Sequence, residues 1–267
     1  MAKITATAES LLHGFSLFSL PLASEPLFKV LALEIDPTER KVRNTVQSEN
    51  KASFMHGVIN HWQIEGEASK IVVDAEELLK FLGAFGPKDV VSIDFGETIV
   101  LKSSRKRAVI YPEALTPLIP ESLPKVKEGV AHYRVKPGVE EFVPAETRAT
   151  VPTDAFREFI NDSKLIYDTP AKSIFPLRFE PNSENAKGSI RAALGSEQSK
   201  HNIVETTVET EVTGVPIEIK LSKDFINIFH NVDKHCSIQL TANKPVVILV
   251  EQESYKLLYV TAPLREG

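Results

Sequence analysis

Residues 221–264, LSKDFINIFHNVDKHCSIQLTANKPVVILVEQESYKLLYVTAPL, contain the pattern that decides the predicted fold. Ser222 is a suitable N-cap for a short helix, which follows the strand-like run PIEIKL. CSIQLTA, PVVILVEQ and KLLYVTAP then read as three strands between turn residues. The apolar positions of the helix are Phe225, Ile226, Ile228 and Phe229.

The same order of elements occurs in the first half of the chain. KIVVDAEELLKFLGAF predicts a strand and a short helix with Asp74 as N-cap, and DVVSIDF, ETIVLKSS and RAVIYPEA predict three strands. Its helical apolar positions match those of the second half one for one: Leu78, Leu79, Phe81 and Leu82. The chain is therefore expected to contain a duplicated unit.

A further helix is expected at the start of each half. Leu11, Leu12, Phe15 and Phe18 share one helical face, and Thr153 can cap a helix with the stripe Phe156, Phe159 and Ile160. FKVLALEI, ASFMHGVI, SIFPLRFE, GSIRAAL and NIVETTVETEV read as strands. We therefore expect an α+β protein of two repeated domains, each with antiparallel sheets and two short helices.

Prolines indicate where the chain divides. Seven of its 17 prolines fall between positions 112 and 152, a density that excludes a central strand or a regular helix. We expect an extended crossover over about 112–144. The predicted boundaries are 1–115 for the N-terminal domain, 116–145 for the connector and 146–267 for the C-terminal domain.

Composition limits the function. The 267 residues include 31 Lys and Arg against 36 Asp and Glu, a net charge of −5 that argues against simple charge-driven binding to nucleic acid. Cys236 is the only cysteine, which excludes an intrachain disulfide and a cysteine-based zinc site. No run of 18 apolar residues predicts a membrane span. We expect a soluble intracellular protein without a membrane partner.

Signatures of catalysis are missing from the sequence. It contains no GxGxxG, GxxxxGK[ST], GxSxG or HExxH motif, and the five-residue spacing of His56 and His61 suits neither face of a helix or strand. We therefore expect no enzymatic activity, no cofactor and no metal. A small-molecule enzyme of α+β fold stays an alternative that would require a pocket.

The stretch 221–264, with its capped helix, its Pro245-Val-Val strand start and its terminal Ala262-Pro263, resembles the C-terminal part of DNA polymerase sliding clamps of the proliferating cell nuclear antigen (PCNA) type. DAEELLKFLGAFGPKD and EFVPAETRATVPTDAFREFI are similar to the family's first-domain helix and to the end of its connector. The resemblance implies a DNA-clamp fold and a closed pseudo-sixfold ring of three subunits. Such a ring encircles duplex DNA without base specificity and tethers DNA polymerase and other replication and repair enzymes, as a processivity factor.

The resemblance also implies three surfaces. Cations on the helices would face DNA: Lys80, Arg157, Lys164, Lys223 and Lys234, with Arg105, Lys106 and Arg107 adding charge near the rim. A client-peptide groove would include Phe142, Val143, Pro144, Pro245, Tyr259, Ala262 and Pro263. Edge strands would join subunits through Arg107, Ala108, Val109, Ile110 and Tyr111 of one copy and Ser189, Ile190, Arg191, Ala192, Ala193 and Leu194 of the next.

The connector is longer than is usual in the family, because residues 113–135 resemble an insertion. The resemblance further implies a clamp loader as partner, and a location in the nucleus of a eukaryote or in the cytoplasm or nucleoid of a prokaryotic or viral system. The weakly basic helices leave one alternative open: a clamp-fold subunit of a heteromeric or checkpoint-type ring, or an adaptor that no longer slides on DNA.

Overall fold

The computed structural model describes residues 1–20, 27–49, 51–112, 114–120, 124–134, 140–163, 174–182, 187–194, 204–222, 232, 235–242 and 244–262. The chain forms two compact units. The first comprises Met1–Glu121 together with Glu251–Tyr259, and the second comprises Ser122–Val250 together with Val260–Gly267. A late segment of the chain therefore returns to the first unit.

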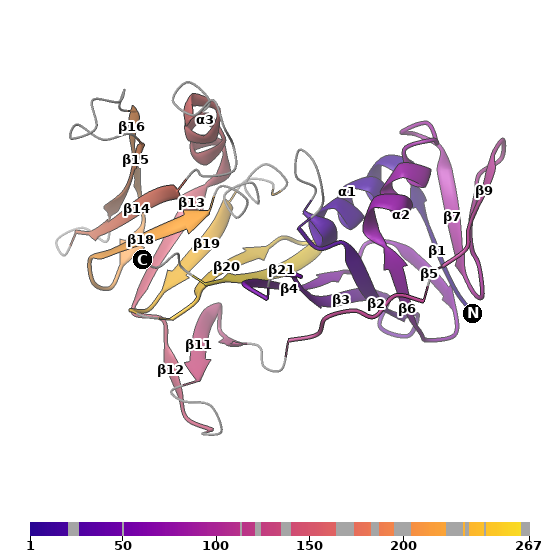
Figure 1. Ribbon diagram of the computed structural model, residues 1–267, viewed down its shortest axis with the longest axis horizontal. Coiled ribbons are helices and arrows are strands. Elements are labelled where there is room, and N and C mark those ends of the chain that lie inside the picture. The colour runs from indigo at the N-terminus through magenta and orange to yellow at the C-terminus, as the bar shows by residue number, and fades with distance from the viewer. Residues whose placement is uncertain are drawn as a thin grey trace. The chain divides into compact units, whose positions relative to one another are not determined.

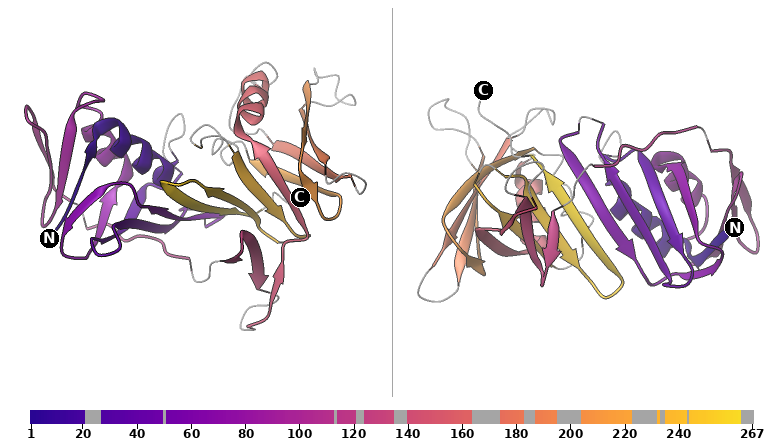
Figure 2. Two further views of the ribbon diagram at one scale, coloured as in Figure 1. Left: turned by 180° about the vertical axis from the view of Figure 1, so that it is seen from behind. Right: turned by 90° about the horizontal axis from the view of Figure 1, so that it is seen from below.

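The first unit consists of two antiparallel sheets and two helices (Figure 1). One sheet has the order β5-β1-β7-β8-β9, and the other contains β21-β4-β3-β2-β6. Both helices lie on one face of the second sheet, which is nearest the viewer when the unit is seen from below (Figure 2). The element bounds are β1 Ala2–Thr7, α1 Ala8–Ser19, β2 Val30–Asp36, β3 Lys41–Gln47, β4 Ser53–Ile59, β5 Gln63–Gly66, β6 Ser69–Asp74, α2 Ala75–Leu82, β7 Val90–Phe95, β8 Ile99–Lys102, β9 Arg107–Ile110 and β21 Tyr255–Thr261.

Burial in the first unit follows the sequence periodicity. Every second residue of β3 and β4 is buried, as expected for strands with one face on the core. In α1 the predicted stripe is confirmed for Leu11, Phe15 and Phe18, whereas Leu12 is only half-buried and Leu17 is buried in its stead. The predicted cap of α2 is also confirmed, because the Asp74 carboxylate accepts a 2.7 Å hydrogen bond from the amide of Glu77.

The second unit repeats this order of elements with a third, smaller sheet added. Its sheets run β16-β15-β14-β18, β17-β13-β19-β20 and β10-β11-β12. The expected helix after Ser222 lies outside the described residues, as do the side chains of the stripe on the helix that begins at Thr153. The element bounds are β10 Lys125–Lys127, β11 Val130–Arg134, β12 Phe142–Pro144, β13 Thr147–Pro152, α3 Thr153–Ser163, β14 Ile174–Pro181, β15 Gly188–Leu194, β16 Val204–Thr210, β17 Val212–Thr213, β18 Ile217–Ser222, β19 His235–Leu240 and β20 Val246–Glu251.

The connector differs from the expected extended crossover, because β10, β11 and β12 form a three-stranded antiparallel sheet. Four of its prolines precede β10, and Pro144 ends β12, so neither β10 nor β11 contains proline. The buried side chain of Gln239 on β19 holds this sheet. Its amide nitrogen donates to the carbonyl of Gly129 at 2.6 Å, and its amide oxygen accepts from the backbone of Ala131 at 2.7 Å.

Candidate interaction surfaces

Side chains suited to chemistry are scattered over the described part of the chain. No group of three or more His, Cys, Asp or Glu that could hold a metal ion occurs among the described residues. Cys236 is buried in β19, and burial raises the pKa of its thiol. No helix among the described residues is long and apolar enough to cross a membrane. The candidate sites are therefore the free sheet edges and the charged surfaces.

The first free edge is β9, the last strand of the five-stranded sheet. β9 pairs with β8 alone among the described strands, and Tyr111 beyond it is 73% exposed. Beside β9 lies a hollow of about 320 Å³. Its apolar lining is Val73, Phe81, Ile110, Pro112 and Leu115, and its polar lining is Asp74, Glu76, Glu77 and Lys80. An unpaired backbone edge next to a hollow with both apolar and charged lining is a suitable surface for another chain.

The second expected edge requires a correction. Residues 189–194 belong to β15, which is hydrogen-bonded to β14 on one side and to β16 on the other. The expectation that Ser189, Ile190, Arg191, Ala192, Ala193 and Leu194 form an edge strand is therefore wrong. Small and apolar residues occur in central strands as well as in edge strands that pair with another chain, so the composition of this segment did not distinguish the two.

The free edge on that side of the sheet is β16, which has no partner other than β15 among the described strands. Its sequence VETTVET exposes Glu205, Thr207 and Glu209 in alternation. Glu205 forms an ion pair with Arg191 of β15 at 2.6 Å. Charged residues are typical of natural edge strands, since they discourage unspecific pairing, and this signal could have identified β16 from the sequence.

The helix cations expected to face DNA have different surroundings. Lys80 is exposed in the last turn of α2, at the hollow beside β9. Arg157 on α3 donates to the Asp154 carboxylate at 2.8 Å and to the carbonyl of Val232 at 2.7 Å. Arg157 therefore already has two partners within its own unit. Lys164, Lys223 and Lys234 lie outside the described residues.

The residues of the expected peptide groove differ in exposure. Phe142 and Val143 are half-buried on β12, and Pro144, Pro245 and Ala262 are exposed, whereas Pro263 lies outside the described residues. The ring of Phe142 is in contact with two cations, since the Lys125 ammonium lies 4.2 Å and the Arg134 guanidinium 5.6 Å from its centroid.

Tyr259 requires a correction, because it does not line a groove. Its side chain is completely buried in the first unit, and its hydroxyl donates to the carbonyl of Leu17 at 2.6 Å. Burial raises the pKa of this phenol. Leu17 is in the last turn of α1, where carbonyls lack a partner within the helix, so Tyr259 completes the end of that helix. The expectation placed Tyr259 in the groove because its position in the C-terminal strand matches the groove of the clamp family that the sequence resembles.

The hairpin between β8 and β9 carries the densest positive charge. Residues 102–107, KSSRKR, contain four cations and no acid. Their turn is closed by a 2.9 Å hydrogen bond from the amide of Ser103 to the carbonyl of Lys106. Lys102, Arg105, Lys106 and Arg107 are all exposed.

Comparison with known proteins establishes the architecture. No protein-family model and no curated protein matches the chain. A solved structure of A. fulgidus PCNA bound to the C-terminal region of FEN-1 is similar, with a TM-score of 0.69 and 15% sequence identity over 100% of both chains. The two repeated units, their antiparallel sheets and their short helices thus form the two-domain α+β clamp fold.

Proposed function

We propose that the protein is a sliding clamp that encircles duplex DNA and tethers DNA polymerase and other replication and repair enzymes to it. The observation that carries this proposal is the likeness to a clamp over the full length of both chains. A ring that encircles DNA stays on it without high binding affinity for DNA. The net charge of −5 is therefore compatible with this role.

Ring closure would use the two free edges. Each copy carries β9 on its first unit and β16 on its second, so β9 of one copy can pair with β16 of the next. Contacts between two different surfaces of the same chain form a ring when the rotation closes. We propose a ring of three copies, as implied by the clamp fold, with Arg107 of β9 near the acidic side chains of β16.

Client enzymes would dock through short peptides. The similar A. fulgidus PCNA is bound to the C-terminal region of FEN-1. In this chain we propose that clients bind near Phe142, Val143 and Pro144 of the connector sheet, where a half-buried aromatic ring lies beside an exposed proline. A clamp loader would open the ring for DNA.

A second candidate is a clamp-fold subunit of a heteromeric ring, or an adaptor that does not slide. It is favoured by the charge of the helices. Among their described exposed residues, acidic side chains outnumber cationic ones. Lys80 is exposed, but Arg157 is engaged within its own unit. The exposed acids of the same helices are Glu9, Glu76, Asp154 and Glu158.

Solution mass separates the two candidates. Light scattering after size exclusion, over a concentration series, should give about three times the 29.6 kDa of one chain if a homotrimer closes. The same sample should stay on nicked circular DNA and slide off after the circle is linearised. A monomer at every concentration contradicts the homomeric ring and supports the heteromeric or adaptor role.

A further inference from the structure

Two hairpins of the chain occupy equivalent places in the two repeats. The first joins β8 to β9 over Lys102–Arg107 and is called here the basic hairpin. The second joins β20 to β21 over residues 251–256 and is called the paired hairpin. In each, the amide of the first turn residue donates to the carbonyl of the fourth at 2.9 Å, from Ser103 to Lys106 and from Gln252 to Tyr255. The two hairpins therefore share this closing hydrogen bond.

The residues that flank the two turns differ in charge. In the paired hairpin, the ammonium of Lys256 lies 3.2 Å from the Glu251 carboxylate. In the basic hairpin, the corresponding positions hold Lys102 and Arg107, which are opposite each other in the β8–β9 register. Like charges at directly opposed positions destabilise a strand pair. Since the repeat forms the same turn with an ion pair, folding does not require the two cations.

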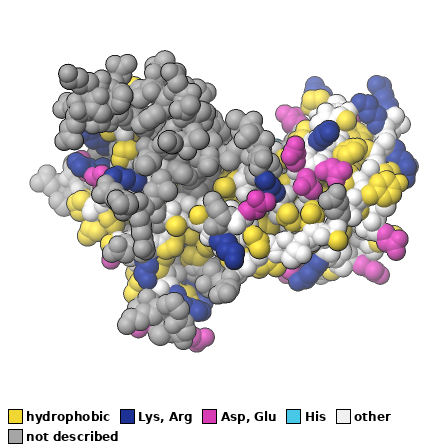
Figure 3. Space-filling model, viewed as in Figure 1, with side chains coloured by type: hydrophobic (Ala, Val, Ile, Leu, Met, Phe, Trp, Pro, Cys, Tyr) yellow, Lys and Arg dark blue, Asp and Glu magenta, His cyan; other side chains and the backbone are white. Residues whose placement is uncertain are grey.

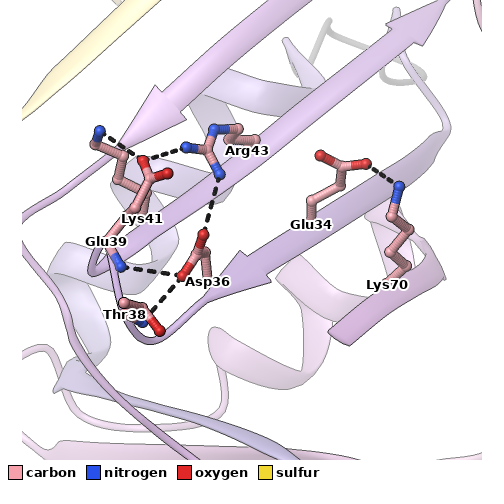
Figure 4. A network of polar contacts seen from close by, with 7 residues as sticks. All are labelled: Glu34, Asp36, Thr38, Glu39, Lys41, Arg43 and Lys70. Carbon is pink, nitrogen blue, oxygen red and sulfur yellow. Dashed lines mark hydrogen bonds and ion pairs between the residues drawn. The ribbon is translucent and has the colours of Figure 1, made fainter. Parts of the chain in front are cut away.

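Several other cations of the first unit have acidic partners. At the β2–β3 turn, Glu39 accepts from Lys41 at 2.9 Å and from Arg43 at 2.5 Å (Figure 4). These cations lower the pKa of the Glu39 carboxyl, first through the hydrogen bond from Lys41 and then through the charge of Arg43. On the neighbouring strands Lys70 pairs with Glu34 at 2.5 Å.

The basic hairpin differs from the rest of the first unit because it brings several cations without an acidic partner together in one turn. Lys102, Arg105 and Arg107 form no ion pair within the part of the chain that the structure describes. In Figure 3, Lys and Arg side chains gather around the end of this hairpin, at the far right of the view. Residues 1–116 as a whole hold 13 Lys and Arg against 15 Asp and Glu, so the positive charge is concentrated locally in an acidic domain.

The fourth cation fixes the position of the hairpin. The Lys106 ammonium donates to the carbonyl of Ala84, just beyond the C-terminal end of α2, where carbonyls attract a cation. The Ser103 hydroxyl oxygen accepts from the amides of Arg105 and Lys106 at 3.3 and 3.2 Å. The turn is thereby held to the helix and braced internally, so that the remaining three cations are presented on a fixed support.

We propose that the basic hairpin is a phosphate-binding element that contacts the backbone of duplex DNA. The choice of DNA as the polyanion rests on the proposed function. Phosphate contacts need cations and no apolar anchor, whereas protein interfaces depend on buried aromatic or aliphatic anchors. Residues 102–107 contain only Lys, Arg and Ser, so they suit phosphate better than an acidic protein surface. Arg105 can bind a phosphate through two nitrogen atoms, and Lys102 can bind one through its ammonium group.

The test compares two variants with equal changes in net charge. Lys102→Glu with Arg105→Ser lowers the charge of the four-cation hairpin by three and recreates across the turn the opposite charges of the paired hairpin. Arg40→Asn with Lys51→Glu makes the same change at two exposed residues of other turns, both in the left-handed conformation that asparagine tolerates at position 40. Binding of each protein to a short labelled random-sequence duplex is measured by fluorescence anisotropy over a salt series, and urea unfolding verifies the fold.

The hairpin variant is expected to bind duplex DNA about tenfold more weakly, with a slope of log K against log salt smaller by about 2, because two phosphate contacts are lost. The control variant should bind as the parent protein does. Equal binding by the two variants overturns the proposal. So does a hairpin variant that keeps its affinity for DNA but no longer binds polyglutamate, which indicates an acidic protein partner instead.

These outcomes are separable from the failure of the ring. A trimer whose hairpin variant binds DNA as the parent does contradicts the phosphate element and leaves the clamp intact. A monomer whose hairpin variant loses DNA affinity contradicts the ring and supports the phosphate element. Lys102→Glu alone restores opposite charges across the turn, so a loss of affinity in that variant cannot be attributed to a hairpin that fails to form.

Discussion

The two units anchor a distant segment through one polar side chain each, and the two anchors differ in kind. In the first unit the hydroxyl of Tyr259 donates to one carbonyl at the end of α1. In the second unit the amide of Gln239 bonds to Gly129 and Ala131, and the carbonyl of Gln239 accepts from the Tyr133 hydroxyl at 3.0 Å. The Tyr259 hydroxyl adds one hydrogen bond to the end of a helix whose apolar face is already buried. The Gln239 side chain instead supplies two hydrogen bonds that attach the small connector sheet to β19.

The edges of the two units differ as well. β9 begins with Arg107 and follows the basic hairpin, while β16 exposes Glu205 and Glu209. Either edge would repel a second copy of itself, and each is complementary to the other. The duplicated units have thus diverged where a head-to-tail contact would need opposite charges.

The largest effect is expected from breaking the second anchor. Gln239→Leu keeps the volume but leaves the carbonyl of Gly129 and the amide of Ala131 without their partner, at a cost of about 3 kcal/mol of unfolding free energy. Limited proteolysis should then cleave the connector between β10 and β12. Gln63→Leu, at an exposed glutamine of β5, is the control and should change stability little.

Removing the hydroxyl from the first anchor should cost less. Tyr259→Phe leaves the ring in its buried site but removes the hydrogen bond to the Leu17 carbonyl. The free energy of unfolding in urea should therefore fall by about 1 to 2 kcal/mol. Tyr111→Phe removes the same atom from an exposed ring. If both variants lose equal stability, the bond to Leu17 does not support the helix end.

The smallest effect is expected from charge reversal at the two free edges. Glu209→Arg and Arg107→Glu should each weaken association about fivefold at low salt, because like charges then meet between copies. The double variant restores opposite charges and should associate within about twofold of the parent protein. Light scattering over a concentration series measures all three variants. Additive losses in the double variant would contradict pairing of β9 with β16.

Local patterns in the sequence were sufficient for most of the described helices and strands outside the connector. The capped helix at Asp74, the stripe on α1 and the strands after α2 follow from periodicity, because each depends on neighbours within a few residues. The connector sheet could not be predicted, because it depends on Gln239, more than 100 residues away in the chain. The burial of Tyr259 likewise depends on a helix end 242 positions earlier.

Strand order was the main limit for the candidate surfaces. GSIRAAL and VETTVET both favour strands, and apolar content alone does not distinguish a central strand from an edge strand, whereas the alternating glutamates of VETTVET are a signal for the edge. The charges of the basic hairpin were visible in the sequence. The contrast with the paired hairpin was not visible in the sequence, because it depends on which residues are opposite each other across each turn.

The buried thiol of Cys236 has a practical consequence for studying assembly. Because it is the only cysteine, and burial raises its pKa, it should react slowly with maleimide dyes in the folded protein. An added cysteine at an exposed position away from β9, such as Val90→Cys, would then carry nearly all of the label. Energy transfer between copies labelled in this way would report subunit exchange in real time, without removal of the native cysteine.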